Sequence, residues 1–497
     1  MTENNHKTAE VGITLLGLGP GDPAALTRQA WDWLNTIDKL ILRTTHHPSV
    51  ASLPAHLNLE SFDELYERMD SFEAVYATIV DRIITLGRTT SVTYAVPGHP
   101  FVAEATCPEI ARLAVAADIP LRVIDGLSFI EPTFAALGLD PFPELVLSDA
   151  IEISQRQTPG FPPSEPVLIA QIYDRDVASQ VKLTLMVAYP DEHPVRLVHA
   201  AGTVDALVEN LPLHAIDHSP HLGLLSSLYV PQLSPGASFE SFQEVIARLR
   251  APDGCPWDRE QTHLSLRPFL LEEAYEALDA LDREDMDDLA EELGDLLLQI
   301  VLHAQIATED GDFNIHHVLE GINSKLIRRH PHVFSEVEVA DVEGVIRNWE
   351  QIKAEERQTH GAPEKKGLLD GVPIALPALS QAEQVIERVQ RVGFEGLSAL
   401  GDQETIQKII DAFEKAEVGM RKALLGDFLL AVTSLAYKAD IDAESALREA
   451  LQRFRVRFNN MEAQALASGQ TLMDLSAQEK ARLWDATGYR DENEADL

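Results

Sequence analysis

The sequence predicts a multidomain protein in which an N-terminal α/β domain precedes an all-α region. Over residues 10–232, short apolar segments end in glycine turns and lead into segments of helical periodicity, a pattern that is typical of α/β domains. Residues 229–236 contain two prolines and one glycine, so this segment is expected to be a linker. From Ser238 onward the apolar residues recur at helical spacing, and no segment shows the alternation typical of a half-buried strand.

The composition limits the partners that this chain can have. Its 497 residues are too many for one ordinary core, so about two to four domains are expected. Forty lysines and arginines stand against 80 acidic residues, which gives a formal net charge of −40. Such a surface repels polymeric nucleic acid and anionic membranes, so neither is an expected partner. An anionic nucleotide would need a local basic patch or a metal ion to bind here.

The two cysteines and the N-terminal residues indicate the cellular compartment of the protein. Cys107 and Cys255 are far apart in the sequence, so no disulfide framework follows from them and a reducing compartment is the simplest setting. The first ten residues are polar and lack the apolar core of a signal peptide. No apolar run reaches the length that spans a bilayer. We therefore expect a cytoplasmic protein.

Three strands of the N-terminal domain are expected to end in turns that carry glycine. Residues 11–16 lead into Gly17–Asp22, residues 90–96 into Pro97–Pro100, and residues 121–124 into Asp125–Ser128. Helices are expected at 25–36 and 71–86. Glycine turns at strand ends let a backbone approach a ligand closely. The glycine spacing is not G-x-G-x-x-G, so tight turns without a ligand are an equally good interpretation of the loop alone.

The order of these three turns resembles the tetrapyrrole (corrin and porphyrin) methylase family, and Val195–Gly202 is similar to its C-terminal half. The resemblance covers residues 10–232 and implies a two-lobed α/β fold. It also implies binding of S-adenosylmethionine by Pro20, Gly98, Gly126 and Ser128. Most of that family has Gly-Asp-Pro where this chain has Gly98-His99-Pro100. Cofactor binding is therefore expected, and methyl transfer to a tetrapyrrole is left open.

Two predicted helices of the all-α region carry paired carboxylates. Glu273 and Glu276 lie at i and i+3 on one helix, and Glu292 and Asp295 at i and i+3 on the next, so each pair shares a helix face. The short polar turn between the helices ends at Asp285, a suitable N-cap, so the helices should pack antiparallel. Converging carboxylates repel one another unless a hard cation such as Mg²⁺ binds them. The alternative is two solvated charged faces, which are common in acidic chains.

A basic cluster follows these helices. Asn314 is expected to cap a helix that stops before Pro331 and carries Lys325, Arg328 and Arg329 near its end. In a chain of such negative charge the cluster suits a phosphate group. The alternative is that these cations only complement the negative end of the helix dipole.

Two tryptophans are candidates for contact with a nucleobase. Trp257 lies in a predicted loop at 253–258, where it is either a platform for a base or a buried anchor of the loop. Trp349 and Lys353 lie at i and i+4 on a later helix, where they would provide a second platform and another contact with phosphate.

Together these motifs resemble the MazG family of nucleoside triphosphate pyrophosphohydrolases, from about Phe239 to the C-terminus. The resemblance implies an all-α fold and Mg²⁺-dependent hydrolysis of nucleoside triphosphates to monophosphate and pyrophosphate. Glu273, Glu276, Glu292 and Asp295 would bind the metal, and Glu272 would orient or deprotonate the attacking water. The motifs are Cys255–Asp258, Glu260–Thr262, Glu272–Glu276, Glu292–Asp295, Arg328–Phe334 and Asn348–Lys353.

The helical region divides into two similar units, at 238–360 and 368–490. In the second unit Asp411, Glu414 and Asp427 align with acids of the first, but Ile410 and Leu424 replace two others. Three carboxylates hold Mg²⁺ less well than four, so the second repeat is expected to be structural. The wide apolar faces of both units, together with the resemblance, indicate a homodimer.

Two other functions stay open at this point. The N-terminal domain would be a methyltransferase if an acceptor binds beside the cofactor. It would be a regulatory module if it senses S-adenosylmethionine and adjusts the hydrolase. Because the four paired carboxylates suit a metal-dependent hydrolase, hydrolysis is the preferred interpretation of the three.

Overall fold

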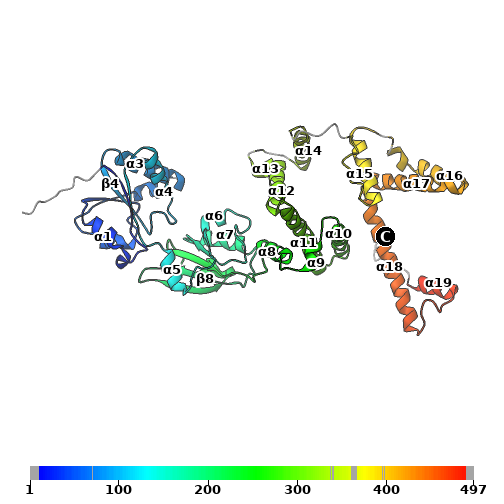
Figure 1. The fold of residues 1–497 in the computed structure, drawn as a ribbon, viewed down its shortest axis with the longest axis horizontal. Coiled ribbons are helices and arrows are strands. Elements are labelled where there is room, and N and C mark those ends of the chain that lie inside the picture. The colour runs from blue at the N-terminus through cyan, green and yellow to red at the C-terminus, as the bar shows by residue number, and fades with distance from the viewer. Residues whose placement is uncertain are drawn as a thin grey trace, which may run out of the picture. The chain divides into compact units, whose positions relative to one another are not determined.

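The computed structural model describes residues 11–69, 71–335, 337, 341–359, 367–394, 396 and 398–487. The chain forms two units, Met1–Glu260 and Gln261–Leu497. Each unit is described by itself below, with the elements labelled as in Figure 1.

The first lobe of the N-terminal unit is a parallel sheet with the strand order β3-β2-β4-β1-β5. The interior strand β1 is buried along its whole length, and it pairs with β4 on one side and β5 on the other. The carboxyl ends of β1, β4 and β5 are therefore adjacent. The strands are β1 (Gly12–Gly17), β2 (Lys39–Leu42), β3 (Asn58–Ser61), β4 (Ser91–Val96) and β5 (Leu121–Ile124).

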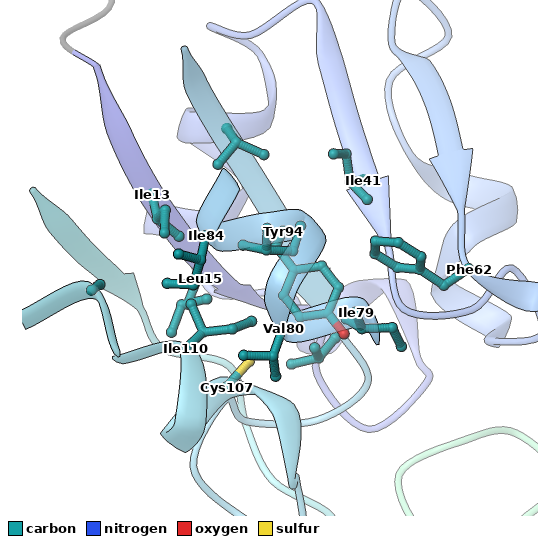
Figure 2. Close-up of a cluster of buried hydrophobic side chains, with 14 of the residues drawn as sticks. Ile13, Leu15, Ile41, Phe62, Ile79, Val80, Ile84, Tyr94, Cys107 and Ile110 are labelled. Atoms are coloured by element: carbon teal, nitrogen blue, oxygen red, sulfur yellow. The ribbon is translucent and has the colours of Figure 1, made fainter. Parts of the chain in front are cut away.

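Helices cover this sheet and close its core. Figure 2 shows side chains of α3 and α4, such as Ile79, Val80 and Ile110, packed around Tyr94. Ser71 caps α3 as its position in the sequence suggests, because its side chain accepts a hydrogen bond from Ala74 N. The helix expected at 25–36 starts later, since Thr27 caps it. The elements are η1 (Pro23–Ala25), α1 (Arg28–Leu34), η2 (Pro48–Ser52), α2 (Asp63–Arg68), α3 (Phe72–Gly87) and α4 (Thr106–Ala116).

The second lobe contains a mixed sheet with the order β6-β7-β10-β8-β9. The strands β6 and β7 are parallel, and the other neighbours are antiparallel. The lobe consists of α5 (Ile130–Leu137), β6 (Val146–Asp149), α6 (Ala150–Ser154), β7 (Val167–Ala170), α7 (Arg175–Leu185), β8 (Pro194–His199), β9 (Leu207–Pro212), η3 (Leu213–His218) and β10 (Ser226–Val230). The α/β fold that the sequence predicts is confirmed.

Two helices after the linker complete this unit, α8 (Phe239–Arg250) and α9 (Pro256–Glu260). The prediction of a loop over 253–258 was wrong at its end, because Pro256 begins α9. Proline is tolerated at a helix start, where its missing N–H would have no partner in the helix.

The described part of the C-terminal unit consists of helices and turns. Asp285 caps α11, accepting a hydrogen bond from Asp288 N at 3.1 Å, and Asn314 caps α12 in a capping box with His317. Both caps were predicted. The elements are α10 (Arg267–Asp282), α11 (Met286–Asp310), α12 (Ile315–Arg329), α13 (Pro331–Phe334), α14 (Val342–Thr359), α15 (Ala378–Arg391), η4 (Ser398–Gly401), α16 (Gln403–Lys415), α17 (Val418–Lys438), α18 (Ala443–Ala467) and α19 (Ala477–Ala486). In the described residues, no helix is both long and apolar enough to cross a bilayer.

Candidate functional sites

The packed hairpin of α10 and α11 brings acids of both helices together. Ligand oxygens of Glu273, Glu276 and Glu292 all lie within 4.8 Å of one another. Asp295 is close enough for its charge to act on both Glu273 and Glu292. We call these four residues the carboxylate cluster. Glu272 is exposed on α10 and is not part of the group of three that the distances define.

Partial burial and repulsion between the acids both raise the pKa of Glu273 and of Glu292. The pKa of Glu273 is raised by partial burial and then by the charges of Asp295, Glu276 and Glu292. The pKa of Glu292 is raised by partial burial and then by Glu276, Asp288 and Asp295. Each of these charged neighbours is an acid, so the ionised forms of Glu273 and Glu292 are disfavoured. A hard cation would relieve the repulsion, since carboxylate oxygens are the ligands that Mg²⁺ prefers.

The basic cluster at the end of α12 is engaged with α14. Arg329 donates to Glu356 from Nη2 at 2.7 Å and from Nε at 3.2 Å, and Arg328 Nε donates to the same carboxylate at 2.8 Å. Arg329 and Glu356 are mostly buried, whereas the side chain of Arg328 is 47% exposed. The two arginines hold the pKa of Glu356 down at about 2 by hydrogen bonding and charge.

Trp349 also belongs to this contact between α12 and α14. The guanidinium of Arg329 lies 5.3 Å from the centre of its ring, and Lys353 Nζ lies 4.5 Å from it. Cations attracted to the indole ring in this way compete with a stacked base. Lys325 is exposed on α12, and Trp257 lies on α9 of the N-terminal unit with 57% of its surface exposed.

The three glycine turns of the first lobe meet at the carboxyl edge of the sheet. Gly19 and Gly98 exchange two backbone hydrogen bonds, at 3.2 and 2.8 Å. A Cβ on Gly126 would overlap the carbonyl of Gly98, and one on Gly17 would lie 2.5 Å from Gly126 N. Gly98 has a φ of +66°, and no heavy atom comes within 4 Å of the place of its missing Cβ. The turns thus pack backbone on backbone and leave open space in front of Gly98.

Pro20 and Ser128 are buried and contact other residues of the same domain. Pro20 packs against Gly202 of the second lobe, with its Cγ 2.7 Å from where a Cβ of Gly202 would be. Ser128 Oγ donates to Glu131 and accepts from Ile130 N, in the first residue of α5, at 3.0 Å. Near the first turn, the buried Nδ1 of His47 has no hydrogen-bond partner among the described residues.

His99, in the second glycine turn, pairs with Asp125. Its Nδ1 accepts a hydrogen bond from Phe101 N at 3.0 Å, so a neutral His99 carries its proton on Nε2. That nitrogen lies 3.4 Å from Asp125 Oδ1. The pair lies at the same sheet edge as the three turns.

Glu356 and Asp125 were not predicted as site residues from the sequence. Glu356 could have been found, because Trp349, Lys353 and Glu356 lie at i, i+4 and i+7 and so share one face of a helix. Asp125 directly follows β5, and the end of a parallel strand is a frequent position for ligand-binding residues.

The segment 368–490, predicted to be a second repeat, contains a helix hairpin formed by α16 and α17. Among the residues that the structure describes, Asp411, Glu414 and Asp427 do not form a group that could hold a metal. The guanidinium of Arg457 lies 4.0 Å from the ring centre of Trp484 and donates to its carbonyl. Like Arg329 over Trp349, it places an arginine over a tryptophan ring.

Comparison with known proteins identifies both parts of the chain. Residues 12–217 match the model of the tetrapyrrole (corrin/porphyrin) methylases, and residues 261–334 match that of the MazG nucleotide pyrophosphohydrolase domain. The second match includes Glu272 and the whole carboxylate cluster.

Relatives cover the whole chain or its second half. YabN of Bacillus subtilis is 39% identical over 95% of this chain and 97% of its own length. The nucleoside triphosphate pyrophosphohydrolase/pyrophosphatase MazG of Thermotoga maritima is 38% identical over 52% of this chain and 98% of its own. The nucleoside triphosphate pyrophosphohydrolase of Escherichia coli K12 is 38% identical over 48% of this chain and 93% of its own. Among solved structures, a uroporphyrin-III-C-methyltransferase from Thermus thermophilus is 20% identical over 44% of this chain and 94% of that chain, with a TM-score of 0.36.

Proposed function

The chain belongs to the MazG family, whose helical domain here follows a tetrapyrrole methylase domain, and we propose that it hydrolyses nucleoside triphosphates to nucleoside monophosphate and pyrophosphate. The observation that carries this proposal is the convergence of Glu273, Glu276 and Glu292 within 4.8 Å. The relatives named for this activity cover the same half of the chain.

We further propose that the cluster binds Mg²⁺. The donor set fits, because it consists of carboxylates that lie beside one another, and acidic neighbours and partial burial raise the pKa of Glu273 and of Glu292. When bound, Mg²⁺ would neutralise the triphosphate and lower the pKa of a coordinated water. The number of acids suits one or two ions.

The protein side chains would bind and orient the substrate. Water attacks the α-phosphorus, the bond from that phosphorus to the bridging oxygen breaks, and pyrophosphate leaves. Glu272, exposed beside the cluster, would orient the water or accept its proton. Lys325, Arg328 and Lys353 would hold the leaving pyrophosphate. Arg329 and Trp349 contact each other and would hold the residues that bind the pyrophosphate in place.

We propose that the helical unit forms a homodimer. Apolar side chains on α10 and α11 stay exposed, including Leu271 at 54%, Leu293 at 51% and Leu297 at 38%. A second copy would cover such faces.

For the N-terminal domain we propose binding of S-adenosylmethionine. The open space in front of Gly98 is a cradle that a side chain would fill. The acids Asp125 and Glu131 flank the turns, which suits a cationic sulfonium better than a phosphate. Whether the bound cofactor serves methyl transfer or regulation is tested by calorimetric titration with and without candidate acceptors.

Product analysis tests the hydrolase. A panel of nucleoside triphosphates is incubated with the wild type and with Glu273→Gln, with Mg²⁺ present or chelated. The proposal requires monophosphate and pyrophosphate from the wild type, and their loss in the variant and on chelation. Nucleoside diphosphate with phosphate as the products would contradict it.

A further inference from the structure

One contact reaches from the second repeat to the helix that carries the carboxylate cluster. The guanidinium of Arg448, on α18, lies over the ring of Tyr275 on α10, 4.7 Å from its centre. Tyr275 is half-buried and lies in the same helical turn as Glu273 and Glu276. The second repeat lacks an acid group of its own among the described residues, yet it contacts the helix that presents two acids of the first.

Arg448 is presented by a well-anchored part of α18. Asp442 caps this helix and accepts a hydrogen bond from Ser445 N at 2.6 Å. Glu383 of α15 lies close enough to Asp442 that, after partial burial, the charge of Asp442 raises the pKa of Glu383. The guanidinium of Arg448 also lies 3.7 Å from Glu444, one turn before it, and its side chain is 26% exposed. Two elements of the second repeat therefore fix the place from which Arg448 meets Tyr275.

Arg448 contacts a side of α10 on which apolar side chains are exposed. Leu271 and Leu278, four residues before and three after Tyr275, are 54% and 41% exposed. Glu272 lies three residues before Tyr275, on the same face. A cation over an aromatic ring resists sliding and rotation of the helix that carries the ring, because the attraction depends on the position over the ring.

Small rotations of α10 matter for metal binding. Glu273 and Glu276 would move with Tyr275, whereas Glu292 and Asp295 belong to α11. The ligand oxygens lie within 4.8 Å of one another, and Mg²⁺ requires oxygens at nearly ideal octahedral positions about 2.0–2.1 Å from the ion. A shift of a few tenths of an ångström between the helices would weaken the site.

We infer that Arg448 is a positioning residue for the carboxylate cluster, through which the second repeat tunes the metal affinity of the first. The inference rests on the proposed metal-dependent hydrolysis at this cluster. It assigns the second repeat a role in the activity in addition to its structural one.

The test uses the full chain and measures metal binding apart from turnover. Calorimetric titration with Mg²⁺ alone is carried out on the wild type, Arg448→Ala, Tyr275→Leu and the double variant. We expect about two- to fivefold weaker binding in each single variant, the size of a cation–π contact. The double variant should be no weaker than either single one. The concentration of Mg²⁺ for half-maximal hydrolysis should rise by the same factor.

Arg453→Ala is the matched control. Arg453 lies on the same helix and has a similar partner one turn before it, Glu449 at 3.6 Å. This variant should bind Mg²⁺ like the wild type. Wild-type affinity in both Arg448→Ala and Tyr275→Leu would overturn the inference, and so would equal weakening in Arg453→Ala. A wild type that binds Mg²⁺ but hydrolyses no nucleotide would instead overturn the proposed function. Circular dichroism identifies a variant that fails to fold, and the other single variant then decides.

Discussion

Arg329 and Glu356 form a two-pronged ion pair between α12 and α14, with Nη2 and Oε2 2.7 Å apart. Their side chains are only 13% and 15% exposed, so this pair is far less screened than an ordinary surface pair. Arg328 and Trp349 join the same contact. The residues predicted as a phosphate clamp thus also connect two helices.

We expect Glu356→Gln to lower the stability of the helical unit in a manner that depends on pH. The pKa of Glu356 is lowered from 4.5 to about 2 by its hydrogen bonds to Arg329 and Arg328. A lowered carboxyl pKa contributes stability above the unfolded value, and this contribution is lost as the pH falls through the folded value. The difference between wild type and variant should therefore be full at neutral pH, shrink below 4.5 and vanish near about 2.

Urea unfolding followed by circular dichroism at several pH values measures this difference. Glu449→Gln is the control, because the pair of Glu449 with Arg453 is exposed and its atoms are 3.6 Å apart. A difference that stayed constant down to the lowest pH would show that the charge of Glu356 is not what stabilises the contact.

The hairpin and the ion pair differ in how far they could be predicted from sequence. The facing acids of α10 and α11, and the cap at Asp285, follow from local spacing and one polar turn. The pairing of Arg329 with Glu356 depends on how α12 packs on α14, which no local pattern specifies. In the first lobe, β2 and β3 have four residues each and were not predicted, because such short runs show no clear period. The role of Pro20 at the second lobe likewise depends on a contact with Gly202, far along the chain.

Neutralising one acid of the cluster should stabilise the metal-free protein. The pKa of Glu273 is raised by partial burial and by its acidic neighbours. A raised carboxyl pKa means that stability is lost as the pH rises through the unfolded value toward the folded one, so the ionised cluster is destabilising at neutral pH. In a chelator, Glu273→Gln should melt at a higher temperature than the wild type. Added Mg²⁺ should raise the melting temperature of the wild type and leave that of the variant unchanged. A variant that melts at a lower temperature than the wild type in the chelator would show that the acids of the cluster do not destabilise the metal-free protein.

A side chain at Gly98 should block the cofactor site while the domain still folds. No atom lies within 4 Å of the new Cβ, so Gly98→Ala meets only the strain of its φ of +66°, roughly 1–2 kcal/mol. Gly138→Ala is a close control, because Gly138 has the same φ and equally open surroundings at the end of α5. Both variants should lose similar stability. Calorimetric titration should show S-adenosylmethionine binding in Gly138→Ala and none in Gly98→Ala, whereas equal binding would place the cofactor elsewhere.

Asp295 and Asp427, which the sequence predicts to be corresponding acids of two repeats, should differ in their importance for hydrolysis. Asp295 acts on both Glu273 and Glu292, whereas Asp427 aligns with it in a repeat where Leu424 replaces the other acid of the pair. Asp295→Asn should lower kcat/KM by about 100-fold or more, because it weakens a metal that contributes several kcal/mol to the transition state. Asp427→Asn should leave kcat/KM within about twofold, as expected for an exposed surface change. Steady-state kinetics at saturating Mg²⁺ measures both, and an equal loss in the two variants would mean that both repeats take part in catalysis.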